Sequence, residues 1–449
     1  DVELSMLEKM SQGIKQRETN RPVRLVYDDS MPKYMFDFLC EKLSLDPEEN
    51  TTASGKYRNF RDFIGFPNVG PKYLENPKMS ALNCTAFDKA DNVFDAITDG
   101  DILLYYPFHK FRYLTDFVRA ASFDPAVKEI RITIYRVASK SQILKSLIDA
   151  VRNGKKVTVI VELRARFDEE ANIEWARDLT DAGIDVEFGV SSLKCHSKII
   201  HIKREEQGEL VSYAHVGTGN FNEKTARIYT DFAMFTKNPE ITAEVEKVFE
   251  FIINPYKQFN FKHLQVSPNH SRNRIYKLID AEIEQAKQGQ KAEILLKVNN
   301  LVDSGLAKKL YEASGAGVKI RLIVRGMCNI QPGIKGVSEN IQAISVVDRY
   351  LEHPRVAIFH AAGDKTTYIS SADWMTRNID HRVEVGCPVL DKKNKKVIKD
   401  LLELQWRDTT KARVIDAEQT NAYVRRGNRK KIRSQVETYN YLKQLERTN

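Results

Sequence analysis

GKKVTVIV at residues 154–161 and GVKIRLIV at residues 317–324 repeat one pattern, a glycine turn followed by β-branched and aliphatic residues. A short apolar run bounded by a turn predicts a buried strand. Apolar residues at helical spacing precede the first run and predict an amphipathic helix: Ile143, Leu144, Leu147, Ile148 and Val151. A helix followed by a strand in two places indicates a duplicated α/β fold.

The elements around the two strings follow the same order. The first copy opens with a predicted strand at 129–135 and continues with a predicted helix at 169–182. The second copy has a predicted strand at 293–298 and a predicted helix at 305–313. Hydrophobic strands after a glycine turn are common, so a true duplication must also be visible in the polar residues.

The length of 449 residues predicts two or three domains. We expect two tandem α/β domains at 83–263 and 264–449. Residues 1–82, with a strand-like run at 23–27 and a helical stretch around 34–43, are expected to form the last part of a preceding α+β domain. Because the first residue is Asp1 and not methionine, we expect the chain to begin inside a longer gene product.

Composition excludes several classes of protein. Hydrophobic residues make up 42% and charged residues 29%, and no window approaches the roughly 18 consecutive apolar residues of a membrane span. The five cysteines include no CxxC pair, which disfavours a disulfide framework or zinc site and favours the cytoplasm. The net charge of +9 favours a polyanionic partner.

The polar residues of the two copies also match. The first copy carries His196-Ser-Lys198 and later Gly217-Thr-Gly-Asn220, and the second carries His353-Pro-Arg355 and later Ser370-Ser-Ala-Asp373. Each half thus supplies one histidine, one cation two residues later, and a turn of small residues after a hairpin. Two such halves facing each other would place His196 and His353 across a shared cleft.

This pattern suits phosphoryl transfer. Residues i and i+2 of a strand point to one side, so His196 would lie beside Lys198, and His353 beside Arg355. Each pair combines a nucleophile with a phosphate anchor. Neutral imidazole is a good nucleophile near pH 7, and its phosphoramidate keeps a high transfer potential. The second histidine can then protonate the leaving oxygen.

Arginines follow the predicted strands at the end where ligands collect in α/β sheets. Arg136 follows the first strand, Arg164 and Arg166 follow the second, and Arg325 occupies the equivalent end in the second copy. A guanidinium group matches the geometry of phosphate oxygens. The strand ends therefore predict a phosphate cradle.

Longer strings carry a resemblance to known families. They are RFDEEAN at 166–172, HVGTGNFNEKTARIYTD at 215–231, YLEHPR at 350–355 and SSADWMTRN at 370–378. The paired histidine strands resemble those of the phospholipase D superfamily. The strings are more similar to type 1 polyphosphate kinases, a bacterial family with the same duplicated fold, and the resemblance covers essentially the whole chain from partway through the family's second domain.

The resemblance to type 1 polyphosphate kinases implies reversible phosphate transfer between ATP or ADP and inorganic polyphosphate, with Mg²⁺ as cofactor. It implies that His196 is phosphorylated and that His353 is the second catalytic histidine and a nucleotide contact. Further implied ATP or phosphate contacts are Tyr229, Arg325 and Arg382. Arg136 and Arg166 match positions associated with Mg²⁺-bound phosphates. Because guanidinium has no lone pair to donate, we expect these two to contact phosphate and not the metal.

Two other functions stay open. A phospholipase D-type phosphodiesterase would use the same histidine pair, although that family's motif has an aspartate where this chain has Lys203 and a lysine where it has Arg355. A non-catalytic polyanion-binding protein would need the cations but not the histidines. We expect a cytoplasmic homo-oligomer that does not bind nucleic acid, has no transmembrane segment and is compatible with peripheral membrane association.

Overall fold

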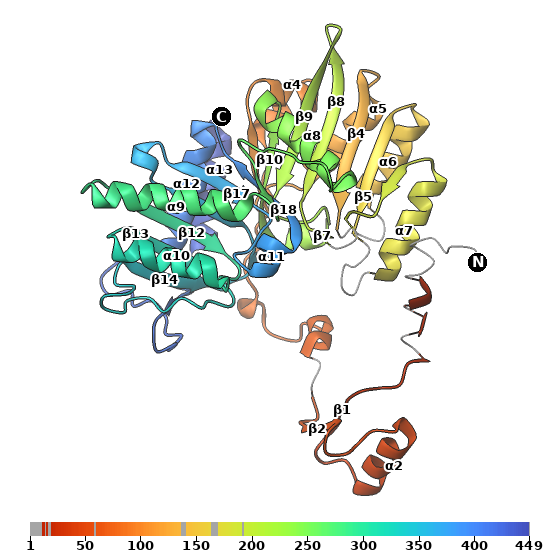
Figure 1. Ribbon diagram of the computed structural model, residues 1–449, viewed down its shortest axis with the longest axis vertical. Helices are drawn as coiled ribbons and strands as arrows, with labels where there is room; N and C mark the ends of the chain where they lie inside the picture. Colours follow the sequence, from red (N-terminus) through yellow and green to blue (C-terminus); the bar gives the residue numbers. More distant parts are fainter. Residues whose placement is uncertain are drawn as a thin grey trace. The chain divides into compact units, whose positions relative to one another are not determined.

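The computed structural model describes residues 11–13, 15–16, 19–57, 60–135, 141–162, 169–190 and 193–448. The chain divides into two compact units, Asp1–Lys78 and Met79–Asn449 (Figure 1). In the first unit, β1 (Leu25–Asp28) pairs in parallel with β2 (Thr51–Ser54). The helix α2 (Lys33–Leu43) connects them, close to where the sequence predicts a helix, and two 3₁₀ helices follow at Phe60–Gly65 and Lys72–Leu74.

The second unit contains two α/β halves with a sheet each. The strands of the first half are β3 (Ile102–Tyr106), β4 (Val127–Ile134), β5 (Lys156–Val161), β6 (Asp185–Glu187), β7 (Lys194–Cys195), β8 (Ile199–Glu206), β9 (Glu209–Gly217) and β10 (Tyr229–Thr236). The strands of the second half are β11 (Gln265–Ser267), β12 (Glu293–Val298), β13 (Lys319–Val324), β14 (Ile341–Val346), β15 (Leu351–Glu352), β16 (Arg355–Phe359), β17 (Thr366–Ser370), β18 (Arg382–Pro388) and β19 (Ala412–Ile415).

Helices pack against both sheets. Those of the first half are α3 (Thr85–Lys89), α4 (Val93–Thr98), α5 (Arg112–Phe123), α6 (Gln142–Arg152), α7 (Glu169–Asp181) and α8 (Pro239–Ile253), with a 3₁₀ turn at Thr225–Arg227. Those of the second half are α9 (Ser271–Lys287), α10 (Ser304–Gly315), α11 (Thr376–Asp380), α12 (Lys392–Trp406) and α13 (Ser434–Thr448), with a 3₁₀ turn at Ala361–Gly363. None of the helices in the described ranges is long and apolar enough to cross a membrane.

The strand order confirms the predicted duplication. The first sheet runs β10-β9-β8-β4-β5-β6, with β3 on the outer side of β10. The second runs β18-β17-β16-β12-β13-β14, with β11 on the outer side of β18 and β19 added at the far edge. The parallel strands β4, β5 and β6 correspond to β12, β13 and β14, so the two repeated glycine-strand strings occupy the same place in both sheets.

Each sheet also borrows a short strand from the other half. β7 pairs in parallel with β18, and β15 pairs in parallel with β10. One hydrophobic cluster extends across the junction and joins Phe232 and Met234 of β10 to Val356 of β16 and Ile369 of β17. The halves are therefore held together by a common core and by two reciprocal strand pairings.

The predicted strands and helices that fall in the described ranges match the structure to within about two residues, except at the two histidine motifs. His353 lies between β15 and β16, so it does not share a strand with Arg355. Residues 196–198 do not lie within a strand, because the chain crosses between sheets there. The backbone N–H groups of His196 and Ser197 both donate to the carbonyl oxygen of Val383, at 2.9 and 3.0 Å. His196 therefore lies on the connection between β7 and β8.

A buried ion pair holds β15 in the junction. Lys297 of β12 and Glu352 of β15 have side chains only 3% and 2% exposed and bond to each other. The remaining Glu352 oxygen positions accept from Gln405 of α12 at 2.9 Å, from Gln435 of α13 at 2.8 Å and from the Thr230 hydroxyl at 3.2 Å. Complete hydrogen bonding of this kind is what allows a charge pair to be buried.

We predict that Lys297→Met lowers the free energy of unfolding by about 3–5 kcal/mol, because it leaves the Glu352 carboxylate buried without its cation. Urea denaturation of the two proteins measures the difference. The matched control is Lys319→Met on β13, where the lysine is exposed and a change within about 0.5 kcal/mol is expected. Equal stability of the two variants would show that the buried pair does not hold the junction.

Candidate active site

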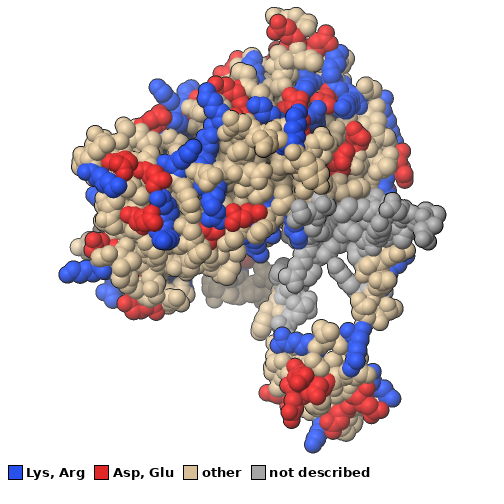
Figure 2. Space-filling view, in the orientation of Figure 1, with Lys and Arg blue, Asp and Glu red and all other residues tan. Residues whose placement is uncertain are grey.

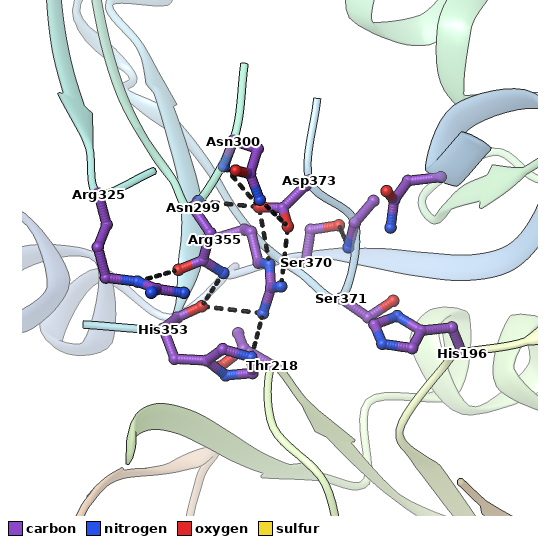
Figure 3. Close-up of polar contacts among 12 residues, drawn as sticks. His196, Thr218, Asn299, Asn300, Arg325, His353, Arg355, Ser370, Ser371 and Asp373 are labelled. Carbon is purple, nitrogen blue, oxygen red and sulfur yellow. Dashed lines mark hydrogen bonds and ion pairs between the residues drawn. The ribbon is translucent and has the colours of Figure 1, made fainter. Parts of the chain in front are cut away.

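The exchanged strands place both histidines beside carboxylates of the opposite half. His196 follows β7, and its Nδ1 lies 2.9 Å from Oε2 of Glu384 on β18. His353 follows β15, and its Nδ1 lies 2.8 and 2.9 Å from the two carboxylate oxygens of Asp231 on β10. Figure 3 shows both rings at the junction of the two halves. The two histidine–carboxylate pairs are equivalent positions of the duplicated fold.

The small-residue turns hold these carboxylates. The hydroxyl of Thr218 donates to Asp231 at 2.6 Å, and the hydroxyl of Ser371 donates to Glu384. Each hydroxyl also accepts a backbone N–H of the neighbouring strand. A Cβ atom on Gly219 would lie 2.0 Å from the Asp231 carboxylate, so this turn requires glycine. The hydroxyl groups of the turns are thus occupied in orienting the histidines.

The two imidazole rings differ at Nε2. The Nε2 of His196 forms no hydrogen bond with a described residue, whereas Nε2 of His353 lies 3.1 Å from Nη1 of Arg355. A guanidinium can only donate, so His353 accepts at Nε2 and donates from Nδ1 to Asp231. His196 also faces a carboxylate at Nδ1, and its Nε2 lone pair is left open by the described residues.

Burial keeps both histidines neutral. It lowers the pKa of His196 to about 4, against the opposing effect of Glu384. It likewise lowers the pKa of His353, against the opposing effect of Asp231. Desolvation disfavours the imidazolium form more strongly than one neighbouring carboxylate favours it. At neutral pH the open Nε2 of His196 therefore carries a lone pair that can act as a nucleophile.

The two cations of the repeated motif lie close together but differ in their surroundings. Lys198 is 2% exposed, its Nζ contacts the carbonyl oxygen of His196, and burial lowers its pKa to about 7. Arg355 is fixed by Asp373, with contacts of 3.2 and 3.1 Å. The charge of Arg355 contributes to the lowered pKa of Lys198, as expected for cations that share one site.

Three more residues predicted from the sequence lie at this junction. Arg325 donates from Nε to the side-chain oxygen of Asn299 at 3.1 Å (Figure 3). The same Nε also donates to the carbonyl oxygen of Glu352 at 2.7 Å, directly before His353. The Tyr229 ring lies 5.2 Å from the His353 ring. Arg382 pairs in register with Lys194, and its charge lowers the pKa of His196. The structure therefore brings together all the predicted site residues within its described ranges. Arg136, Arg164 and Arg166 lie outside those ranges.

The sequence analysis did not identify the carboxylates as site residues. Asp231 follows Tyr229 by two positions at the start of β10, and Glu384 follows Arg382 by two positions at the start of β18. This spacing, on equivalent strands of a duplicated unit, was the available signal. The repeated polar motif ends at the turns before these strands, at Asn220 and Asp373, and so does not include the two carboxylates.

Two further histidines of the first half, His201 and His215, are buried. His201 and His215 are 0% and 1% exposed, and their ring nitrogens have no hydrogen-bond partner among the described residues. Burial lowers their pKa values to about 4 and about 3. Among the described residues, neither ring therefore forms a hydrogen bond with the histidine–carboxylate pairs.

The described residues do not fit a magnesium cage built from protein ligands alone. They contain no group of three or more His, Cys, Asp or Glu side chains arranged to hold a metal ion. Asp231, Glu384 and Asp373 are already committed to His353, His196 and Arg355. Mg²⁺ commonly binds through substrate phosphates with few protein ligands, and the cations of this junction suit phosphates directly.

Comparison with known proteins identifies the family. Residues 1–66 match the polyphosphate kinase middle domain, residues 92–258 the polyphosphate kinase C-terminal domain 1, and residues 264–435 the C-terminal domain 2. The chain is 58% identical over 447 residues to a polyphosphate kinase of Vibrio parahaemolyticus, which covers 100% of the chain and 64% of the relative. It is 53% identical over 448 residues to that of Escherichia coli K12, covering 99% and 65%.

A solved structure agrees. The crystal structure of polyphosphate kinase from Porphyromonas gingivalis superposes with a TM-score of 0.86 at 38% identity, covering 96% of this chain and 66% of that one. The chain spans about 64% of the length of the Vibrio relative. These matches cover both halves of the duplicated unit and the segment before it, and they place the chain in the polyphosphate kinase family, of type 1.

Proposed function

We propose that this chain carries the catalytic centre of an ATP–polyphosphate phosphotransferase that works through a phosphorylated His196. The single observation that carries the proposal is the open Nε2 of His196, whose Nδ1 is held by Glu384 at 2.9 Å. An imidazole ring that is held at Nδ1 and carries no proton at Nε2 presents the Nε2 lone pair in one direction. Family membership supports ATP and inorganic polyphosphate as the two substrates.

In this mechanism Nε2 of His196 attacks the terminal phosphorus of ATP, and the bond from that phosphorus to the bridging oxygen breaks. ADP leaves, and the phosphate is held on nitrogen. A terminal oxygen of polyphosphate then attacks the phosphorus and the phosphorus–nitrogen bond breaks, which lengthens the polymer by one unit. The reverse sequence makes ATP, since phosphoramidates keep a high transfer potential.

His353 is proposed to donate a proton to the leaving oxygen. Its Nε2 accepts from Arg355 in the structure, so it must first gain a proton and part from Arg355. Asp231 stabilises the imidazolium that results. A carboxylate on the far nitrogen is the usual way to hold such a ring in one tautomer.

The cations are proposed to bind the phosphates. Arg355, Arg325 and Arg382 supply fixed or nearby positive charge, which stabilises the loose transition state of phosphoryl transfer. Lys198, with its pKa lowered to about 7 by burial, gains positive character when a phosphate approaches, because an anion raises the pKa of a lysine. Tyr229, whose ring lies beside that of His353, is proposed to contact the nucleotide.

Mg²⁺ is proposed to arrive with the nucleotide phosphates, since the described carboxylates do not offer it a cage. Arg136 and Arg166, outside the described ranges, remain proposed phosphate contacts.

The domain boundaries at 82/83 and 263/264, a cytoplasmic location and a homo-oligomeric state are likewise proposals. Phosphodiesterase activity would differ by passing the phosphate from His196 to water, and a polyanion-binding protein would form no phosphohistidine.

We predict that γ-labelled ATP transfers its label to His196 alone. Tandem mass spectrometry under alkaline conditions, where phosphohistidine survives, locates it. His196→Ala should abolish labelling, and His381→Ala, which removes an exposed histidine, should not. Label on another residue, or labelling that persists in His196→Ala, would rule out the assignment, and rapid loss of label to inorganic phosphate without an acceptor would favour the phosphodiesterase.

We also predict that His196 titrates well below the ordinary histidine range. Because its pKa is lowered to about 4 by burial, the ring stays neutral as the pH falls from 8 to about 5 and gains its proton only below that. Titration of the histidine ring resonances by NMR, with His196→Ala to assign the signal, measures the midpoint. A midpoint near 6.5, the ordinary value, would mean that the ring is solvated and not poised as described.

A further inference from the structure

A cluster of cations between β19 and α13 has no role in the site described above. The residues 425–431, here called the basic segment, contain Arg425, Arg426, Arg429, Lys430 and Lys431, all exposed. Among the described residues, no carboxylate lies within ion-pair distance of any of these five. Figure 2 shows one face of the protein, on which both acidic and basic side chains are exposed. Like charges at this density repel one another, so a polyanion is the expected ligand.

The basic segment starts at the same edge of the second sheet as the candidate active site. Ile323 of β13 pairs with Ile344 of β14, and extending this register brings Arg325 level with Val346. Val346 pairs with Ala412 of β19, and the N–H of Val424 donates to the carbonyl oxygen of Ala412 at 2.9 Å. Val424 therefore lies level with Arg325 across the strands of the sheet. Arg425 follows Val424 and extends past the carboxyl ends of β13 and β14.

Three strand spacings separate Arg325 from this point, roughly 14 Å at about 4.8 Å per spacing. That is beyond the reach of one phosphate group but within the reach of a polymer. In Figure 1 the segment lies beyond β14, outside the sheet. A chain of phosphates with its end at His353 and Arg325 can therefore continue along the sheet edge to the basic segment.

The basic segment is anchored at both ends. Nε of Arg429 donates to the carbonyl oxygen of Arg426 at 3.1 Å around Gly427, which has a φ of 56°. After it, Arg433 forms a bidentate ion pair with Asp348, and the Gln435 side chain bonds the backbone of Tyr350. Asp348 and Tyr350 lead directly into β15 and His353. Through Arg433 and Gln435 the segment is thus anchored to the residues that precede β15 and His353.

We propose that the basic segment binds the part of a polyphosphate chain beyond its reacting end. The inference rests on the proposed function and adds a second binding surface to it. Single-stranded nucleic acid is a weaker fit, because binding it usually requires aromatic side chains for stacking and residues 425–431 contain none. An anionic membrane is a weaker fit for the same segment, which lacks apolar residues that could insert.

The test compares acceptors of different length in the full-length protein. The loop variant carries Arg425→Ser, Arg426→Ser, Lys430→Ser and Lys431→Ser. We expect its KM for long-chain polyphosphate to rise about tenfold at low salt, with kcat and the KM values for ATP and tripolyphosphate unchanged. The salt dependence of the long-chain KM should also become shallower, because fewer cations contact the polymer.

The matched control removes the same charge elsewhere in the same half. It carries Lys277→Ser, Lys319→Ser, Lys392→Ser and Lys393→Ser, four exposed lysines without an ion pair among the described residues. At the same low salt its long-chain KM should stay within about twofold of the wild type, because the four lost charges come from three elements, α9, β13 and α12, and not from one segment that a polyanion can follow. Equal KM values for the loop and control variants, or an equal loss with tripolyphosphate, would overturn the proposal.

Direct binding separates this proposal from the proposed function. Fluorescently labelled long-chain polyphosphate, single-stranded RNA and phosphatidylserine vesicles are titrated against both variants without ATP. Weaker binding of polyphosphate by the loop variant supports the surface even if the wild type proves inactive in phosphate transfer. A loss confined to RNA or to vesicles, with polyphosphate binding intact, would assign the segment to that other partner and refute the inference.

Discussion

The exchange of short strands between the two halves is the constraint on which the site depends. β7 leaves the first half to pair with β18, and β15 leaves the second half to pair with β10. Each pairing ends one residue before a histidine and delivers its ring to a carboxylate on the partner strand. Neither half can therefore orient its own histidine. Correct placement of both rings requires that the halves are folded and docked, which ties the chemistry to the shared core.

The duplication gives two equivalent sets of backbone positions. Different residues at these positions give the two histidines different surroundings. Arg355 is paired with Asp373 and reaches the Nε2 of His353. The equivalent positions of the first half hold Lys198 and Asn220, and the Asn220 side-chain oxygen has no partner among the described residues. As a result Nε2 of His353 is covered while Nε2 of His196 is open. A symmetric fold thereby produces an asymmetric pair of rings, which is the asymmetry that the proposed roles in attack and proton transfer require.

The local pattern of the sequence was enough to predict the repeated strands and helices, because burial on one face imposes a period that can be counted. It also identified the paired histidines, since His196 and His353 recur at equivalent points of the two copies. The strand exchange could not be predicted from the sequence, because pairing between residues 194–195 and 382–383 leaves no local periodicity. That is why His196 was expected within a strand, and why Glu384 was overlooked.

The central claim is that a carboxylate from the opposite half prepares His196 for attack. The most direct measurement is the single-turnover rate of His196 labelling by γ-labelled ATP in Glu384→Gln, with circular dichroism to confirm the fold. The amide keeps the size of the side chain but cannot hold the ring in one tautomer as an anion does, so the account predicts a rate lower by about 10²-fold or more. An unchanged labelling rate in the folded variant would contradict it.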